Sequence, residues 1–214
     1  MPKGYAMNVC VDLSFPLMGK TFPLDHGYPL YAALSRLLPC LHEHKMVGVH
    51  PIRGDAGGDG LLRVAARSCL RIRTPTDLIA EFLPLAGRVL ELDGHSLRVG
   101  VPQVLALRPA AVLGARLVTI KGFTEPAVFL EAARRQLDAL GVSRQAVVEI
   151  PTAPAGRTHA GEPLRRVLRI KDRTVVGFAV HVLHLTAEES VKLQEHGLGG
   201  RRHMGCGILV PVRG

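Results

Sequence analysis

The spacing of apolar residues switches between the period of a strand and the period of a helix, and it does so in the same order twice. Residues 7–15 alternate apolar and polar side chains, whereas residues 28–41 carry leucines at helical spacing, with Pro39 expected to end or tighten the last turn. The elements that follow are predicted as strands at 46–52 and 61–73, a helix with Thr76 as its N-cap, and a strand pair at 89–99. The first half therefore has the order βαββαβ.

The same order returns after a stretch rich in proline, alanine and leucine, residues 102–112, which we interpret as the junction between two modules. The predicted elements are a strand at 115–120, a helix from the N-cap Thr124 to the C-cap glycine Gly141, a strand at 146–150, a hairpin of 164–170 and 174–185, a helix opened by the capping box of Thr186 and Glu189, and a strand at 207–212. We therefore predict an α+β protein of two tandem ferredoxin-like (βαββαβ) modules with antiparallel sheets, residues 1–107 and 108–214.

The charge balance indicates a polyanionic partner. The chain has 27 Lys and Arg against 18 Asp and Glu, a net charge of +9, and such an excess is typical of proteins that bind nucleic acid. Aromatic residues make up only 4% and Trp is absent, which argues against a surface that mainly stacks single-stranded bases. No apolar run approaches the ~20 residues of a membrane-spanning helix, and no secretory segment is evident. We expect a cytoplasmic protein with no membrane partner.

Two predicted strands carry arginines on one face. Alternation in residues 164–171 places Arg165, Arg169 and Lys171 together, opposite the apolar positions, although Arg166 breaks the pattern. The strand at 61–73 does the same with Arg63, Arg67, Arg71 and Arg73. An ordinary solvated face would look similar, but no acidic residue interrupts either run. We expect at least one of these faces to bind a polyanion.

The most specific stretch of the sequence is a glycine-rich segment, residues 197–207, between the last predicted helix and the last strand. Its candidate RNA-binding residues are Gly197, Gly199, Gly200, Arg201, Arg202, His203, Gly205 and Gly207. Glycines permit positive φ and close approach of the backbone, so amide groups here could face phosphate oxygens while the two arginines supply charge. The alternative is a sharp turn that closes the second module, which one or two glycines would already allow.

The stretches HPIRG, GFTEP and GLGGRRHMGCG resemble the CRISPR RNA-processing endoribonucleases of the repeat-associated RNA-binding (RAMP) superfamily, in particular those of the Myxan subtype. The resemblance implies metal-independent cleavage of precursor CRISPR RNA at repeat stem-loops, by attack of a 2′-hydroxyl that leaves a 2′,3′-cyclic phosphate, with no cofactor. Non-catalytic superfamily members carry similar loops. A guide-RNA-binding subunit of a CRISPR effector complex is therefore the alternative, and other subunits of such a complex are candidate partners.

The resemblance also implies a general base close to the first helix. The segment from Cys40 to Lys45 resembles the leucine-histidine-glutamate stretch that carries the base in this family, which makes His42 the first candidate. Histidine suits that role because its pKa lies near working pH. The other candidates are Lys45 as charge stabiliser, Tyr31 for orienting a proton donor, and His26 or His50 as alternative bases.

A zinc site of Cys40, His42 and His44, completed by Cys206 or His50, is the competing interpretation of this segment. No pair among these residues and possible partners has typical ligand spacing, and the four cysteines lack a C-x-x-C pair. We therefore expect the cysteines to act as small apolar residues and the chain to hold no metal.

Overall fold

The computed structural model describes residues 9–154 and 159–212, and its first half is built around β1 (Cys10–Met18). This strand pairs antiparallel with β6 (Cys69–Pro75) on one side and with β8 (His95–Val99) and then β9 (Gln103–Ala106) on the other. β3 (Gly48–Val49) is added at the free edge of β6, and β7 (Val89–Leu92) pairs with β8. The order β3-β6-β1-β8 is the one that a βαββαβ chain forms when it folds as a ferredoxin-like sheet.

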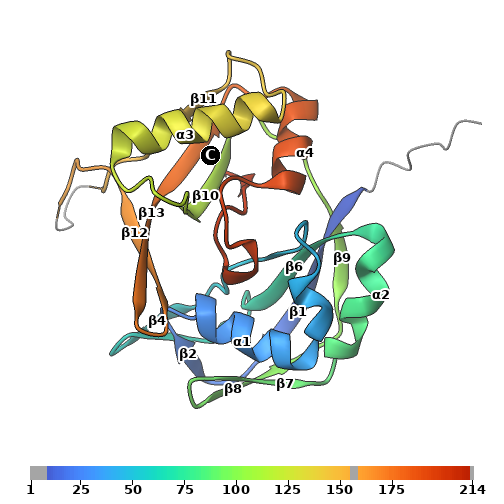
Figure 1. Ribbon diagram of the computed structural model, residues 1–214. Coiled ribbons are helices and arrows are strands. Elements are labelled where there is room, and N and C mark those ends of the chain that lie inside the picture. The colour runs from blue at the N-terminus through green and yellow to red at the C-terminus, as the bar shows by residue number, and fades with distance from the viewer. Residues whose placement is uncertain (1–8, 155–158, 213–214) are drawn as a thin grey trace, which may run out of the picture.

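The helices of this half cover one face of the sheet (Figure 1). α1 (Gly27–Leu37) buries Leu30 and Leu34 against it, and α2 (Ile79–Phe82) buries Phe82. As predicted, Pro39 ends the first helix, and a 3-10 turn, η1 (Pro39–His42), follows. α2 is only one turn long and is flanked by the 3-10 turns η2 (Thr76–Leu78) and η3 (Leu83–Leu85).

The second half repeats the arrangement. Its main strands are β10 (Leu113–Val118), β11 (Val147–Glu149), β13 (Arg173–Leu183) and β14 (Val210–Pro211). They form a sheet with the order β11-β13-β10-β14. β12 (Arg165–Ile170) pairs with β13 as the predicted hairpin. Its helices are α3 (Pro126–Ala139) and α4 (Ala187–His196). The tandem ferredoxin-like α+β prediction is confirmed, and so is the capping box of Thr186 and Glu189.

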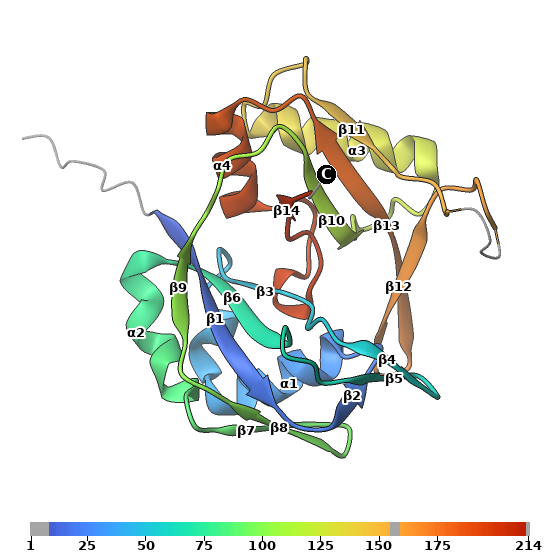
Figure 2. The ribbon, with the colours of Figure 1, turned by 180° about the vertical axis from the view of Figure 1, so that it is seen from behind.

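The two modules lie with their helices on one side and their sheets on the other, as Figure 2 shows from the sheet side. Each has its own apolar core, one drawn from residues 13–99 and one from residues 113–209. Arg73 joins them: its guanidinium is buried, is held by the carboxylate of Asp12, and donates to the backbone carbonyls of Gln194 and Leu209. The division at residue 107 stays a prediction.

Several predicted elements are wrong in extent. The run 61–73 is two strands, because a turn at residues 65–68, closed by the Ser68 hydroxyl, separates β5 (Leu61–Arg63) from β6. β5 belongs to a separate sheet with β2 (Thr21–Pro23) and β4 (Asp55–Gly58). The supposed junction contains β9, whose residues complete the first sheet.

The predicted helix caps and the last strand also need correction. Pro75 and Glu125, not Thr76 and Thr124, occupy the N-cap positions of η2 and α3; Pro126 at the first helical position fixes where α3 begins. The predicted strand at 207–212 shrinks to β14, which pairs with β10 at Leu113 and Gly114; before it, the Gly207 amide donates to the carbonyl of Leu117 in β10. No helix in the described parts of the chain is long and apolar enough to cross a membrane.

Candidate catalytic site and basic cavity

Tyr31 and His42 form a hydrogen-bonded pair on the helix side of the first module. Tyr31 projects from α1, and the turn at Pro39 brings η1 back so that the Tyr31 hydroxyl lies 2.7 Å from Nδ1 of His42. The rings meet edge to face with centroids 5.5 Å apart. His42 is exposed and Tyr31 is half-buried. The pair thus presents an oriented imidazole to solvent, as a general base requires.

The glycine-rich segment contributes a third ring to this cluster. His203 stacks on Tyr31 with centroids 6.2 Å apart and planes within 4° of parallel. Its Nε2 donates a hydrogen bond to the carbonyl of His44 at 3.0 Å. Burial and the nearby positive groups lower the pKa of His203. The cluster of Tyr31, His42 and His203 is therefore assembled from both modules.

His26 and His50, the alternative bases, are buried and hydrogen-bonded. The ring of His26 lies between the carbonyl of Pro23, 2.9 Å from Nδ1, and the amide of Ile52, which donates to Nε2 at 2.9 Å. Burial lowers the pKa of His26 and lowers that of His50 to about 4; His50 contacts Asp12. Their burial and hydrogen bonds favour the exposed His42 as the base, and His26 and His50 stay alternative predictions.

Most backbone amides of the glycine-rich segment form hydrogen bonds within the protein. The amides of Leu198, Gly199, Gly200, Cys206 and Gly207 all donate to protein oxygens. Gly199 and Gly207 have positive φ, and a Cβ at Gly207 would collide with the carbonyl of Leu198. The prediction that these amides face phosphate is therefore not supported. The glycines let the segment fold tightly between the modules.

The two arginines of this segment have different surroundings. Arg202 is 8% exposed, and its Nη2 donates to the carbonyls of Met46 and Glu195. Burial lowers the pKa of Arg202 to about 10. Arg201 is exposed, as is Gly200. We therefore correct the predicted pair: Arg201 remains available to a ligand, and Arg202 holds the segment against the first module.

The basic face of β12 is arranged as predicted. Arg165, Arg169 and Lys171 are exposed, whereas Leu168 on the other face is buried. Arg166 is half-buried and lines a shallow depression between the modules. The second predicted face is only partly real, because Arg73 is 1% exposed and binds Asp12.

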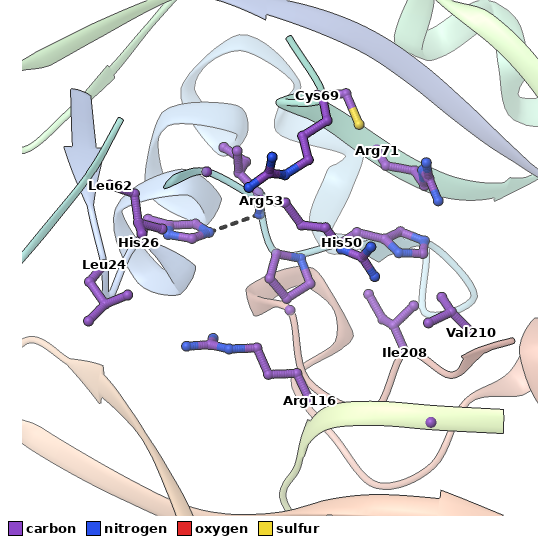
Figure 3. A pocket seen from close by; sticks show the side chains of 16 residues that line it. Leu24, His26, His50, Arg53, Leu62, Cys69, Arg71, Arg116, Ile208 and Val210 are labelled. Atoms are coloured by element: carbon purple, nitrogen blue, oxygen red, sulfur yellow. Dashed lines mark hydrogen bonds between the residues drawn. The ribbon is translucent and has the colours of Figure 1, made fainter. Parts of the chain in front are cut away.

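A basic cavity of about 550 Å³ lies where the modules meet (Figure 3). Its lining includes three arginines from both modules. Arg116 extends from β10 of the second module, whereas Arg53 and Arg71 belong to the first. Arg67 also lines the cavity and pairs with Asp55 outside it. None of the 16 lining residues within the described chain is acidic. Sequence reasoning singled out Arg67 and Arg71 but missed Arg53 and Arg116, which only the docking of the modules brings together.

Comparison with known proteins assigns the family. A family model described as Cas6 Crispr matches residues 11–214. The chain belongs to the Cas6 family. The CRISPR-associated endonuclease Cas6 of Myxococcus xanthus (strain DK1622) is 45% identical over 203 residues, which cover 95% of this chain and 82% of that relative. The predicted family resemblance is thus confirmed.

Two solved structures share the Cas6 fold at low sequence identity. One, described as CRISPR associated protein Cas6, has a TM-score of 0.65 and 12% identity over 96% of this chain and 99% of its own. The other, a Cas6-related protein from Pyrococcus furiosus, has a TM-score of 0.62 and 12% identity over 95% of this chain and 99% of its own. They support the tandem arrangement of the two modules.

Within this Cas6-family chain, the predicted site residues fall into three groups. Tyr31, His42 and His203 are in contact with one another. Lys45 is exposed three residues after His42, and within the described part of the chain it forms no hydrogen bond or ion pair with the cluster. Cys206 is buried against Leu117 and Leu168, and the ligand atoms that gather around Cys40 in the described residues are those of His44 and Glu81. The zinc site that would have combined it with Cys40 is therefore not formed.

Proposed function

We propose that this chain is an endoribonuclease that binds CRISPR repeat RNA and cuts precursor CRISPR RNA into guide RNAs, without a metal ion in the reaction. The observation that carries the proposal is the hydrogen bond between Tyr31 and His42 on a solvent-facing surface of a Cas6-family chain. The similarity to an endonuclease at 45% identity supports the same reaction class.

His42 is the general base of this proposal. When Nδ1–H of His42 donates to the Tyr31 oxygen, Nε2 is unprotonated and turned to solvent, where it accepts the proton of a ribose 2′-hydroxyl. The 2′-oxygen then attacks the adjacent phosphorus, and the bond to the 5′-oxygen breaks. The products are a 2′,3′-cyclic phosphate and a 5′-hydroxyl.

Tyr31 has a second role in the same arrangement. Because its oxygen accepts the hydrogen bond from His42, its own hydroxyl proton is free to be donated to the departing 5′-oxygen. A cation near the phosphorane would stabilise its charge. Lys45 and Arg201 are the exposed cations in the segments that build the cluster, and we assign this role to Lys45 first.

The basic surfaces hold the RNA in this proposal. The cavity arginines and the exposed face of β12 add positive charge on both modules, and phosphate contacts supply most of the affinity of such surfaces. A solved structure with the same fold, TM-score 0.65 and 11% identity over 96% of this chain, is described as a RAMP protein binding different RNA substrates. We propose a repeat stem-loop as the ligand, the cytoplasm as the place of reaction, and subunits of a CRISPR effector complex as further partners.

The test is cleavage of labelled repeat RNA with EDTA present. We expect the wild type to cut and to leave a cyclic phosphate end, detected by mass spectrometry, and His42→Ala to lose at least about 100-fold in rate, the usual contribution of a general base. His196→Ala, at an exposed histidine of α4, is the matched control and should cut normally. Binding without cleavage by the wild type would identify a guide-RNA-binding subunit instead. Undiminished cutting by His42→Ala would refute the assigned base.

A further inference from the structure

Beside the catalytic cluster, three potential metal ligands from two separate segments converge. The donor atoms of Cys40, His44 and Glu81 all lie within 4.8 Å of one another. Cys40 belongs to η1, His44 follows that turn, and Glu81 comes from α2, 37 residues further along the chain. The proposed nuclease reaction uses none of the three.

The geometry suits a small tetrahedral ion. Nε2 of His44 and a carboxylate oxygen of Glu81 are 2.9 Å apart, and zinc binds thiolate sulfur at about 2.3 Å and imidazole nitrogen or carboxylate oxygen at about 2.0–2.2 Å. All three side chains are half-exposed, which leaves them room to rotate toward those distances. The site is open enough for a water molecule to occupy the fourth position.

The donor set selects the metal. A thiolate and an imidazole favour zinc over magnesium or calcium, which take oxygen ligands. Cys40 is better suited than Cys10 and Cys206, because those two side chains are buried, whereas Cys40 is half-exposed beside two further donors.

We propose that Cys40, His44 and Glu81 form a zinc site that ties η1 to α2. On binding, the Cys40 thiol releases its proton to solvent as the sulfur–zinc bond forms, and the proton of His44 moves to Nδ1 so that Nε2 becomes a ligand. Without metal, the same groups form a hydrogen-bonded cluster in which Glu81 is the acceptor.

A zinc ion here would affect the position of the proposed base, His42. His42 lies between Cys40 and His44 in the sequence but points to Tyr31, so it is not a ligand. The ion would hold both flanks of His42 and restrict the turn that carries the proposed base. The inference concerns metal binding alone, which is measured without RNA, so its failure and that of the proposed nuclease function are distinguishable.

The test uses the full chain, stripped of metal and titrated with Zn²⁺ against a chromophoric chelator, and with Co²⁺ as a spectroscopic probe. We expect one ion per chain, a rise in Tm with Zn²⁺, and a Co²⁺ spectrum with a thiolate charge-transfer band. Cys40→Ser should abolish that band, and Cys40→Ser, His44→Gln and Glu81→Gln should each weaken Zn²⁺ binding by more than the roughly 10–100-fold cost of losing an outer hydrogen-bond partner.

Two controls keep the result decisive. Cys69→Ser changes another half-exposed cysteine of the same module and should leave affinity and spectrum unchanged, and His42→Ala should do the same. Circular dichroism confirms that each variant is folded. No saturable binding by the wild type, or equal binding by wild type and folded Cys40→Ser, would overturn the proposal.

Discussion

His203 of the second module stacks in parallel on Tyr31 of the first, with ring centroids 6.2 Å apart. Tyr31 in turn holds His42 through a hydrogen bond of 2.7 Å. The orientation of His42, the proposed base, therefore depends on the docking of the modules, because Tyr31 is held in place by His203 from the other half of the chain. Contacts that fix this docking are expected to affect cleavage without touching RNA.

The substitution Tyr31→Phe tests the role of the Tyr31 hydroxyl separately from that of its ring. Phenylalanine keeps the stacking surface for His203 but removes the group that orients His42. We expect the single-turnover cleavage rate to fall about 10–100-fold, as when an orienting partner of an active histidine is lost, with RNA affinity unchanged. Tyr28→Phe is the matched control, because the ring centroids of Tyr28 and Tyr31 are 6.4 Å apart, while His42 forms its hydrogen bond with Tyr31. Equal rates for Tyr31→Phe and the wild type would contradict the orienting role.

The substitution Arg73→Met tests how much the buried arginine between the modules contributes to stability. The change leaves the Asp12 carboxylate and the carbonyls of Gln194 and Leu209 buried without their donor. We expect the free energy of unfolding, measured with urea, to fall by about 3–5 kcal/mol. Arg67→Met breaks the exposed pair with Asp55 and should cost less than about 1 kcal/mol. Similar losses for the two variants would mean that Arg73 does not join the modules energetically.

Acid should destabilise the protein in a defined range. Burial lowers the pKa of His50 from 6.5 to about 4, so the unfolded chain binds more protons than the folded one between these values. Stability from His50 is therefore fully present above pH 6.5 and is lost as the pH falls towards 4. The whole shift corresponds to about 3 kcal/mol.

Asp12 extends this loss to lower pH. Burial alone would raise its pKa, but hydrogen bonds from His50 and Arg73 hold it well below the ordinary value, so its stabilising contribution is lost only below about pH 4. Urea unfolding at a series of pH values measures both ranges. His50→Gln should flatten the dependence between pH 6.5 and 4 while leaving the steeper loss below it, and an unchanged profile in that variant would exclude His50 as its source.

The order of helices and strands could be predicted from the sequence, but the burial of individual polar side chains could not. The order of elements and the hairpin of β12 and β13 follow from spacing within short segments, whereas His42 is singled out by the resemblance of residues 40–45 to a stretch of the family. By contrast, Arg73 and Arg202 look like other arginines in the sequence, and only the contact between the modules shows that each is enclosed by carbonyl oxygens of distant segments. His26 is the same case, since both its partners depend on how neighbouring loops pack.

The glycine-rich segment is recognisable in the sequence, but the packing that requires its glycines is not. A Cβ at Gly199 would collide with the carbonyl of Thr119, and a Cβ at Gly207 with the carbonyl of Leu198. The cavity arginines illustrate the converse, because Arg53 and Arg116 belong to different modules and no spacing rule connects them.

The cavity arginines provide the last prediction. Arg71 and Arg116 line the cavity from β6 and β10, in a setting with no acidic lining residue among those described. If each contacts one phosphate of a single-stranded part of the RNA, the double variant Arg71→Ala and Arg116→Ala should reduce the slope of log affinity against log salt by about 1.4, since each lost contact removes about 0.7. Arg88→Ala with Arg98→Ala removes the same charge from exposed positions beside β7 and on β8 and should change the slope much less. Equal slopes for the two double variants would show that net charge, and not the cavity, governs RNA binding.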